Sequence, residues 1–435
     1  MINDNFVIKG DICYSKSLTD LECIKNGYLV CKDGVSEGVF EKLPAEYIDL
    51  ALIDCSGMLV LPGMVDLHIH APQFTFRGIG MDLELLDWLK TYTFPEEIKY
   101  EDPDYARVAY RDFVKKMKKS ATTRAVVFST IHRQSTEMLM ETLEESGLIT
   151  YVGKVNMDRE APKALKENDA ETSLEETVAW LSDISGKFPH TKPIITPRFL
   201  ISCTDELLEG LGKVAREYDL PVQSHLSENP EEVKLVHELF PTASCYGDGY
   251  DMYGLFGKDV KTVMAHCVYS TDEEVYRILN NGVFVAHCPT SNMNLASGIA
   301  PIRKYLNLGI KVGIGTDIGA GESESMFRAL CDAIQVSKLY SRLVDKAYKP
   351  LAFEEAFFLA TMGGGEFFGK VGSFEKGYEF DAVVIDDFEL SGLNDFPLRS
   401  RLERAVYLEA DTMYLSKKFV KGREVKADYG NQYFD

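Results

Sequence analysis

The middle of this chain alternates between short hydrophobic runs and helix-like stretches, and no other feature narrows its possible folds as much. Candidate strands occur at Met64–His68, Thr123–Ser129, Tyr151–Val155, Pro193–Thr196, Pro221–Ser224, Thr262–Ala265, Val283–Ala286 and Lys311–Gly315. Candidate helices between them include Ala106–Lys119, Leu174–Ile184, Asp205–Tyr218, Pro230–Leu239 and Asp272–Leu279. This order and a length of about 300 residues predict an α/β protein of the (β/α)₈ barrel type. A doubly wound open sheet is the alternative, but no G-x-G-x-x-G motif follows the first strand.

Both ends of the chain show a different sequence pattern, in which short β-like runs are separated by turns. These runs are Asn5–Lys9, Gly27–Lys32 and Tyr47–Val60 at the start, and Phe380–Ile385, Ala405–Leu408 and Phe419–Val425 at the end. We expect residues 1–62 and 375–435 to form one small β-sandwich domain, with residues 63–374 as the barrel. Independent β extensions at each end are the alternative.

Composition excludes several classes of protein. A formal net charge of −21 argues against a surface that tracks nucleic-acid phosphates. The 9 cysteines are scattered without a C-x-x-C pair, which favours reduced thiols and a cytoplasmic location. No signal-peptide pattern and no apolar stretch long enough to span a bilayer is evident, so we expect no membrane partner.

Polar residues gather directly after the predicted strands. They are His68, His70, His132, Asp158, Arg198, His225, His266, His287 and Asp317, and they include all but two of the 8 histidines in the chain. Barrel enzymes build their active sites at the carboxyl ends of the strands. Packing needs alone do not explain this distribution, which predicts an active site there.

The pair His68 and His70 ends the first barrel strand. Side chains two positions apart point to the same face of a strand, so both imidazoles can approach one ion. Imidazole suits zinc and neighbouring divalent metals. His225 ends the fifth strand and is the natural third ligand. Asp317 ends the eighth strand and, as a fourth ligand, leaves a position for water, although it could instead cap the following helix.

Two further residues are candidates for the chemistry beside the metal. Glu228 lies three residues after His225. We interpret it as a general acid and base, because metal-assisted hydrolysis needs a carboxylate that is not a ligand. The alternative is a carboxylate that stabilises a helix N-terminus. His266 could contact the water at the metal.

The fourth strand argues for one metal per chain. A second metal usually needs a bridging ligand late in this strand, where the chain has Arg198, which cannot bridge metals. Its guanidinium can donate to a carbonyl or a carboxylate, or it can form a structural salt bridge. We assign His132 and His287 mainly to structure, although His287 could line the pocket.

Together these segments resemble the amidohydrolase superfamily and, within it, the guanine deaminases. The resemblance runs from about residue 58 to about residue 385. Its motifs are His70-Ala-Pro-Gln-Phe, Leu85-Leu-Asp-Trp-Leu, Thr91-Tyr-Thr-Phe-Pro-Glu96, Gly153-Lys-Val-Asn-Met-Asp158, Ile195-Thr-Pro-Arg-Phe199, Ser224-His-Leu-Ser-Glu-Asn229, Met264-Ala-His-Cys, Ala286-His-Cys-Pro-Thr-Ser-Asn292 and Gly315-Thr-Asp317. The match is loose in Thr361-Met-Gly-Gly-Gly-Glu and generic at both ends.

The resemblance implies a role for each site residue. Zinc, rather than iron, would bind to His68, His70, His225 and Asp317, with one ion per chain. Glu228 and Asp317 would move protons, and His266 would contact the water at the metal. Gln73, Arg198 and Phe199 would hold the purine beside His225, with Arg198 reaching its carbonyl oxygen. The expected reaction converts guanine and water to xanthine and ammonia in a homodimer.

Two other functions remain open from the sequence. One is a different hydrolysis on the same scaffold, acting on cytosine, an adenosine derivative, a triazine or a cyclic amide. The other is a non-enzymatic assembly protein that has lost its metal, which the retention of Glu228 and all four candidate ligands opposes.

Overall fold

The computed structural model describes residues 5–391 and 394–426. Its central element is an eight-stranded sheet in the order β11-β12-β13-β14-β5-β6-β7-β9, in which all strand pairs are parallel. The strands are β5 (Met64–His70), β6 (Thr122–Phe128), β7 (Ile149–Gly153), β9 (Thr191–Pro193), β11 (Val222–Leu226), β12 (Thr262–His266), β13 (Phe284–His287) and β14 (Val312–Ile314). Every residue of β5 and β6 is buried, as expected for parallel strands covered on both faces.

The two end strands of this sheet approach each other. Ile195, just after β9, forms an isolated parallel bridge with Val222 of β11. Beside it, β8 (Val155–Asn156) pairs with β10 (Thr196–Pro197) as a separate two-stranded sheet. The eight parallel strands agree with the predicted α/β class and its parallel sheet, but the sheet is not closed into a barrel by a ladder, since a single bridge joins its two end strands.

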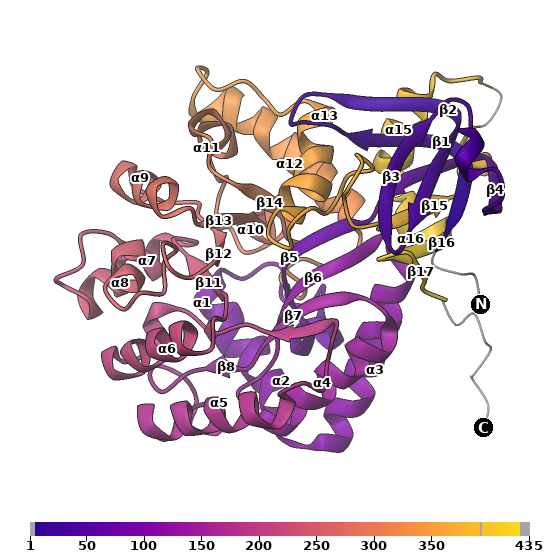
Figure 1. The fold of residues 1–435 in the computed structure, drawn as a ribbon. Helices are drawn as coiled ribbons and strands as arrows, with labels where there is room; N and C mark the ends of the chain where they lie inside the picture. The colour runs from indigo at the N-terminus through magenta and orange to yellow at the C-terminus, as the bar shows by residue number, and fades with distance from the viewer. Residues whose placement is uncertain (1–4, 392–393, 427–435) are drawn as a thin grey trace.

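Helices connect the strands and cover the sheet (Figure 1). The longer ones are α3 (Pro103–Lys119), α4 (Arg133–Ser146), α5 (Ala170–Ile184), α6 (Asp205–Glu217), α7 (Pro230–Leu239), α9 (Asp272–Asn281), α12 (Met326–Leu339) and α15 (Leu398–Tyr407). The shorter ones are α1 (Leu85–Trp88), α2 (Phe94–Ile98), α8 (Tyr246–Asp251), α10 (Pro289–Asn294), α11 (Ile302–Leu308), α13 (Phe353–Phe358), α14 (Phe388–Ser391) and α16 (Ala410–Met413). No helix in the described part of the chain is long and apolar enough to cross a membrane.

Strands from both ends of the chain share one seven-stranded sheet, in the order β17-β16-β15-β4-β1-β2-β3. They are β1 (Phe6–Ser15), β2 (Leu21–Lys32), β3 (Val35–Phe40), β4 (Ala51–Pro62), β15 (Ala382–Ile385), β16 (Leu415–Val420) and β17 (Arg423–Glu424). Figure 1 shows this sheet at the upper right, beside the barrel strands. The pairing of β15 with β4 joins the two ends, but a two-sheet sandwich is not confirmed.

One predicted strand is wrong. Residues Ala405–Leu408 were expected to be extended, yet they lie at the end of α15, where Leu402, Ala405 and Val406 are buried together. A short apolar run fits either a strand or one face of a helix, so periodicity over four residues cannot separate the two.

A glycine makes the passage between the two sheets possible. The chain leaves β4 at Pro62 and enters β5 at Met64, with only Gly63 between them. A Cβ atom at Gly63 would lie 2.2 Å from the Thr123 hydroxyl oxygen, so a larger residue would push β5 away from β6.

Candidate active site

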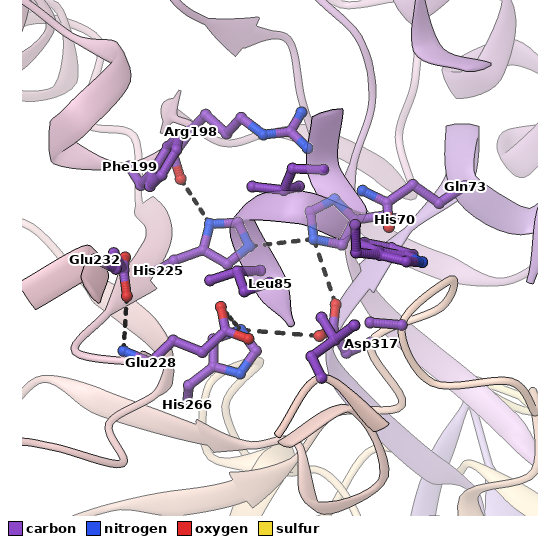
Figure 2. A pocket seen from close by; sticks show the side chains of 14 residues that line it. His70, Gln73, Leu85, Arg198, Phe199, His225, Glu228, Glu232, His266 and Asp317 are labelled. Atoms are coloured by element: carbon purple, nitrogen blue, oxygen red, sulfur yellow. Dashed lines mark hydrogen bonds and ion pairs between the residues drawn. The ribbon is translucent and has the colours of Figure 1, made fainter. Parts of the chain in front are cut away.

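The four predicted metal ligands meet at the carboxyl ends of β5, β11 and β14. The Nε2 atom of His70 lies 3.2 Å from Nε2 of His68 and 3.2 Å from Nε2 of His225. The Oδ1 atom of Asp317 lies 3.2 Å from His68 and 3.4 Å from His70. Figure 2 shows His70, His225 and Asp317 turned toward one another in the pocket.

These distances fit a metal ion. Ligand atoms about 2.0–2.1 Å from a tetrahedral centre lie about 3.3 Å apart, close to the observed spacing. The Nδ1 atom of His225 lies 2.6 Å from the carbonyl oxygen of Arg198, so Nδ1 carries the proton and Nε2 keeps a free lone pair. Burial and the neighbouring His68 lower the pKa of both His70 and His225, which keeps both rings neutral and able to bind a cation.

The strand ends are held by a buried carboxylate that the sequence reasoning missed. Asp66 accepts hydrogen bonds from the backbone N–H of His68 at 3.1 Å and from the backbone N–H and hydroxyl of Thr316 at 3.1 and 2.5 Å. It therefore links β5 to the loop that carries Asp317. Asp66, His68 and His70 alternate along one strand, and this extension of the His-x-His pattern could have revealed it.

Glu228 and His266 lie beside the cluster of proposed ligands. The Nε2 atom of His266 is 3.4 Å from Oε2 of Glu228 and 3.8 Å from Oδ2 of Asp317. Burial and the Asp317 carboxylate raise the pKa of Glu228 to about 8, so this group can hold a proton near neutral pH. Ser297 donates to its other oxygen at 3.1 Å, which orients the carboxyl group.

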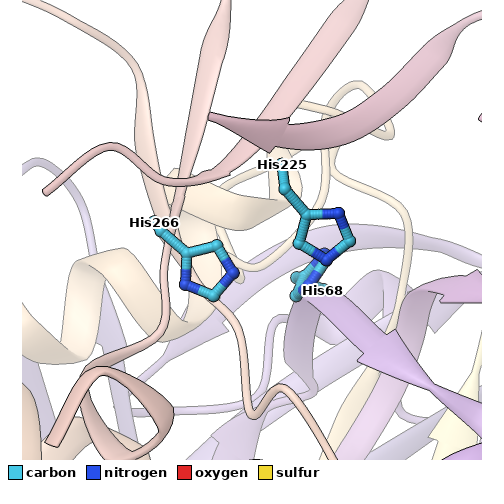
Figure 3. A group of neighbouring side chains, drawn as sticks. All are labelled: His68, His225 and His266. Atoms are coloured by element: carbon cyan, nitrogen blue, oxygen red, sulfur yellow. The ribbon is translucent and has the colours of Figure 1, made fainter. Parts of the chain in front are cut away.

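His266 is oriented from behind by Asn292. The Nδ1 atom of His266 lies 2.9 Å from Oδ1 of Asn292, so Nδ1 carries a proton and Nε2 faces the site. Figure 3 shows the ring of His266 beside those of His68 and His225. The nitrogen ligand atoms of these three rings all lie within 4.8 Å of one another. Asn292 ends the motif Ala286-His-Cys-Pro-Thr-Ser-Asn292, but its contact with His266 could not be inferred from the sequence.

The backbone is in the left-handed region at several of these positions. The φ angles of Ser227, His266, Cys267 and Asp317 are 48°, 74°, 52° and 50°. Residues other than glycine rarely adopt such angles, and those that do cluster at functional sites. Asp317 does not cap the helix that follows, because Ser325 accepts the capping hydrogen bond of α12 from Arg328.

Gln73, Arg198 and Phe199 form another part of the same pocket. Both Gln73 and Arg198 are buried, at 2% and 3% exposed. Arg198 forms an ion pair with Glu97, with contacts of 2.5 and 3.0 Å. The salt bridge considered for Arg198 therefore exists. Its partner, Glu97, directly follows the motif that ends at Glu96, and no pattern in the sequence links it to Arg198. The ring of Phe199 stands at 72° to that of His225, with 6.5 Å between the centroids.

The pocket contains about 410 Å³ of space free of atoms, part of which is open to solvent. Its lining is His70, Gln73, Leu85, Trp88, Leu89, Arg198, Phe199, His225, Glu228, Glu232, His266, Leu295, Asp317 and Ala320. Apolar side chains thus form its walls, and polar groups are placed at two positions, beside the histidines and beside Arg198.

Besides His68, whose ring lies in the histidine cluster, three of the polar residues that follow strands are not among the described residues that line this pocket. His287 lies behind His266 with both ring nitrogens unpaired, and burial lowers its pKa to about 3. Asp158 accepts from the backbone N–H of Thr204 at 2.8 Å and orders the loop before α6. His132 precedes α4.

Comparison with known proteins places this chain in a family. The pattern of the amidohydrolase family matches residues 59–425. A guanine deaminase from Dictyostelium discoideum is 35% identical, over 97% of this chain and 98% of its own length. One from Mus musculus is 42% identical, over 75% of this chain and 72% of its own length.

A solved structure is similar over nearly the whole chain. The crystal structure of guanine deaminase from C. acetobutylicum, with guanine bound in its active site, has a TM-score of 0.94 and 46% identity, and the match covers 97% of this chain and 100% of that one. This chain therefore belongs to the amidohydrolase family and, within it, to the guanine deaminases.

Proposed function

We propose that this protein catalyses the hydrolytic deamination of guanine to xanthine and ammonia, with one zinc ion per chain. One observation carries the proposal: three imidazoles and the Asp317 carboxylate converge beside Glu228, in a pocket that also presents the donors of Gln73 and Arg198. The similarity to a guanine deaminase that binds guanine in its active site supports this choice of substrate.

The proposed ligands are His68, His70, His225 and Asp317. Bound zinc would lower the pKa of water to about 7 and so supply a nucleophile at neutral pH. Nitrogen ligands and one carboxylate suit zinc, and we prefer zinc to iron on that ground.

The protein side chains would then move the protons. Glu228 takes a proton from the attacking water and passes it to a ring nitrogen of guanine, which makes C2 more electrophilic. The water oxygen forms a bond to C2. Asp317, whose carboxylate lies 3.8 Å from His266, takes the second proton and delivers it to the departing amine. The C2–N bond breaks, ammonia leaves and xanthine remains. The raised pKa of Glu228 suits a group that must both accept and release a proton near neutral pH.

The purine would be held between apolar walls, with Arg198 donating to its carbonyl oxygen. A buried donor that loses its acceptor is left unpaired, so a site of this kind rejects analogues that lack the oxygen. Adenine carries an amino group at C6, where guanine carries the oxygen. That amino group is itself a donor, so it could not accept a hydrogen bond from Arg198. We therefore expect guanine to be preferred over adenine and cytosine by at least about 10³-fold.

A steady-state assay with guanine, adenine, cytosine and their nucleosides tests the proposal. The expected result is the highest kcat/KM with guanine in the wild-type protein, and a reduced value in Arg198→Ala with the metal retained. Faster turnover of another base would assign the protein to a different deaminase. An unchanged guanine rate in Arg198→Ala would remove the arginine from the pocket.

The finer structural assignments are also proposals. We infer that residues 63–374 act as a closed catalytic barrel, which the bridge between Ile195 and Val222 supports. We infer a composite β-sandwich domain from residues 1–62 and 375–435, of which residues 1–4, 392–393 and 427–435 lie outside the described residues. An experimental structure with both chain ends would test both assignments.

We further propose a cytoplasmic homodimer that works in guanine catabolism. Two-fold dimers are the commonest homo-oligomers. Light scattering at micromolar concentration checks the subunit number, and a monomer would overturn it. Cell fractionation checks the location.

A further inference from the structure

The buried carboxylate of Glu97 lies behind Arg198 and Gln73, in the part of the pocket that is proposed to hold the purine. It comes from α2 and is 1% exposed. Its Oε2 atom accepts from Nη1 of Arg198 at 2.5 Å, and its Oε1 atom accepts from Nη2 of the same guanidinium at 3.0 Å. Oε1 also accepts from Nε2 of Gln73 at 3.0 Å. One carboxylate thus holds both polar residues proposed to bind the substrate.

These contacts determine which groups remain for a ligand. The Oε1 atom of Gln73 accepts from the backbone N–H of Gly319 at 3.1 Å, so its amide cannot rotate without losing both partners. One N–H of Nε2 is used by Glu97, and one remains free. Arg198 has five N–H donors, of which the fork toward Glu97 uses two. Both side chains can therefore offer donors to the pocket.

The ion pair also fixes the plane of the guanidinium. A bidentate arginine–carboxylate pair has a defined geometry, and here both partners are almost fully buried. The guanidinium carbon lies 5.5 Å from the centre of the Phe94 ring, which limits its movement further. Arg198 and Gln73 are among the described residues that line the pocket, whereas Glu97 is not among them and lies behind them. Glu97 would therefore act through these two residues rather than on the substrate.

We propose that Glu97 is a positioning residue that sets the specificity of this site for purines carrying an oxygen at C6. By accepting hydrogens from Arg198 and Gln73, it keeps their remaining donors directed at the acceptors of the purine. It also supplies the charge that keeps a buried cation paired in the absence of substrate. The inference rests on the proposed deamination of guanine. It adds Glu97 as the residue that holds the donors on which the preference for an oxygen at C6 depends.

The test compares guanine with 2-aminopurine, which keeps the amine at C2 and lacks the oxygen at C6. In Glu97→Gln we expect kcat/KM for guanine to fall by about 10- to 100-fold, mainly through KM. The value for 2-aminopurine should change by less than about threefold, because that substrate offers Arg198 no oxygen to bind. The ratio of the two substrates should therefore fall, and the metal content should stay the same. Equal losses for both substrates, or an unchanged ratio, would overturn the proposal.

Glu96 provides a matched control in the neighbouring position. It is also buried, but it bonds to Thr75, Lys99 and Tyr105 rather than to Arg198 or Gln73. Glu96→Gln should leave the ratio of guanine to 2-aminopurine unchanged, even if it lowers stability. A drop in the ratio as large as that of Glu97→Gln would mean that any disturbance of α2 produces the effect, and would overturn the assignment to Glu97.

A second comparison applies if Glu97→Gln leaves Arg198 unpaired and does not fold. Arg198→Met is then compared with Arg198→Met combined with Glu97→Gln, in which no buried charge is left alone. We expect at most a small further drop of the substrate ratio in the double variant, because only Gln73 is then still held by Glu97. A further drop as large as that caused by Arg198→Met alone would overturn the proposal. Failure of the wild-type protein to deaminate guanine would reject the proposed function and this inference together, whereas guanine turnover with an unchanged ratio would reject only the inference.

Discussion

The backbone N–H of Asp317 donates a hydrogen bond to the carbonyl oxygen of His68 at 2.9 Å. This bond joins the ends of two neighbouring strands, β14 and β5, and brings together a carboxylate and an imidazole that are both proposed metal ligands. The left-handed backbone of Asp317 turns its side chain toward the cluster. The Asp66 carboxylate accepts from the backbone of the same two strand ends, so the proposed ligands are positioned by contacts within the protein itself.

Replacing Glu228 by glutamine should nearly abolish turnover while the metal remains bound. Glutamine has the same shape and can still accept from Ser297, but it cannot carry a proton. Loss of a general acid and base typically lowers kcat by about 10²–10⁴-fold. Glu231→Gln, at an exposed position in α7, is the control and should keep normal activity. Substantial kcat in metal-loaded Glu228→Gln would show that another group moves the proton.

Asp317→Asn should lower both metal retention and rate, which separates its role from that of Glu228. Asparagine removes the one negative ligand, so the ion would be held by neutral imidazoles and a weaker amide oxygen. Elemental analysis should find about one zinc per wild-type chain and less in the variant. Removal of the metal by a chelator should abolish guanine turnover, and added zinc should restore it. Two tightly bound ions per chain, or activity without metal, would contradict the single-metal site.

Lys418 should make stability rise with pH in the alkaline range. Burial lowers the pKa of this lysine to about 7, and its ammonium group donates to the carbonyl oxygens of Met117 and Thr122. An unfolded lysine has a pKa of about 10.4, so between about pH 7 and about pH 10 the unfolded chain binds more protons. The contribution of Lys418 to the free energy of unfolding therefore increases with pH, by at most about 1.4 kcal/mol per unit.

Denaturant unfolding of the wild type and Lys418→Met at about pH 7 and about pH 9 measures this effect. The advantage of the wild type over the variant should be larger at the higher pH. Lys417→Met is the control, because its side chain is 36% exposed and should add no comparable dependence on pH. An advantage that stays constant or shrinks with pH would show that Lys418 is charged in the folded protein at both values.

Asp381→Ala should destabilise the contact between the two sheets. Asp381 accepts from Nε of Arg124 at 2.6 Å and from Nη2 at 3.1 Å, and both residues are buried. Removing the carboxylate leaves a buried guanidinium with one partner fewer, which typically costs about 3–5 kcal/mol. Glu379 contacts the same guanidinium but is one-third exposed, so Glu379→Ala should cost much less. Calorimetric or denaturant unfolding of the two variants measures the difference, and equal losses would contradict the importance of burial.

Much of the fold and of the candidate site could be predicted because both leave local patterns. The alternation of strands and helices located all eight strands of the central sheet to within a few residues, and α7 was predicted at its observed bounds. The period of two along β5 placed His68 and His70 on one face, and the end-of-strand positions of His225 and Asp317 placed them at the same edge. The strand predicted at Ala405–Leu408 failed because four apolar residues do not define a period.

The sequence by itself determined that the chain alternates strands and helices and carries its histidines and carboxylates where parallel strands end. Only the tertiary structure decided which distant side chains meet behind those ligands. The pairing of Glu97 with Arg198, the support of His266 by Asn292 and the burial of Lys418 depend on how separate elements pack against one another. No pattern within a single element encodes such contacts, because each depends on the register and packing of segments far apart in the chain.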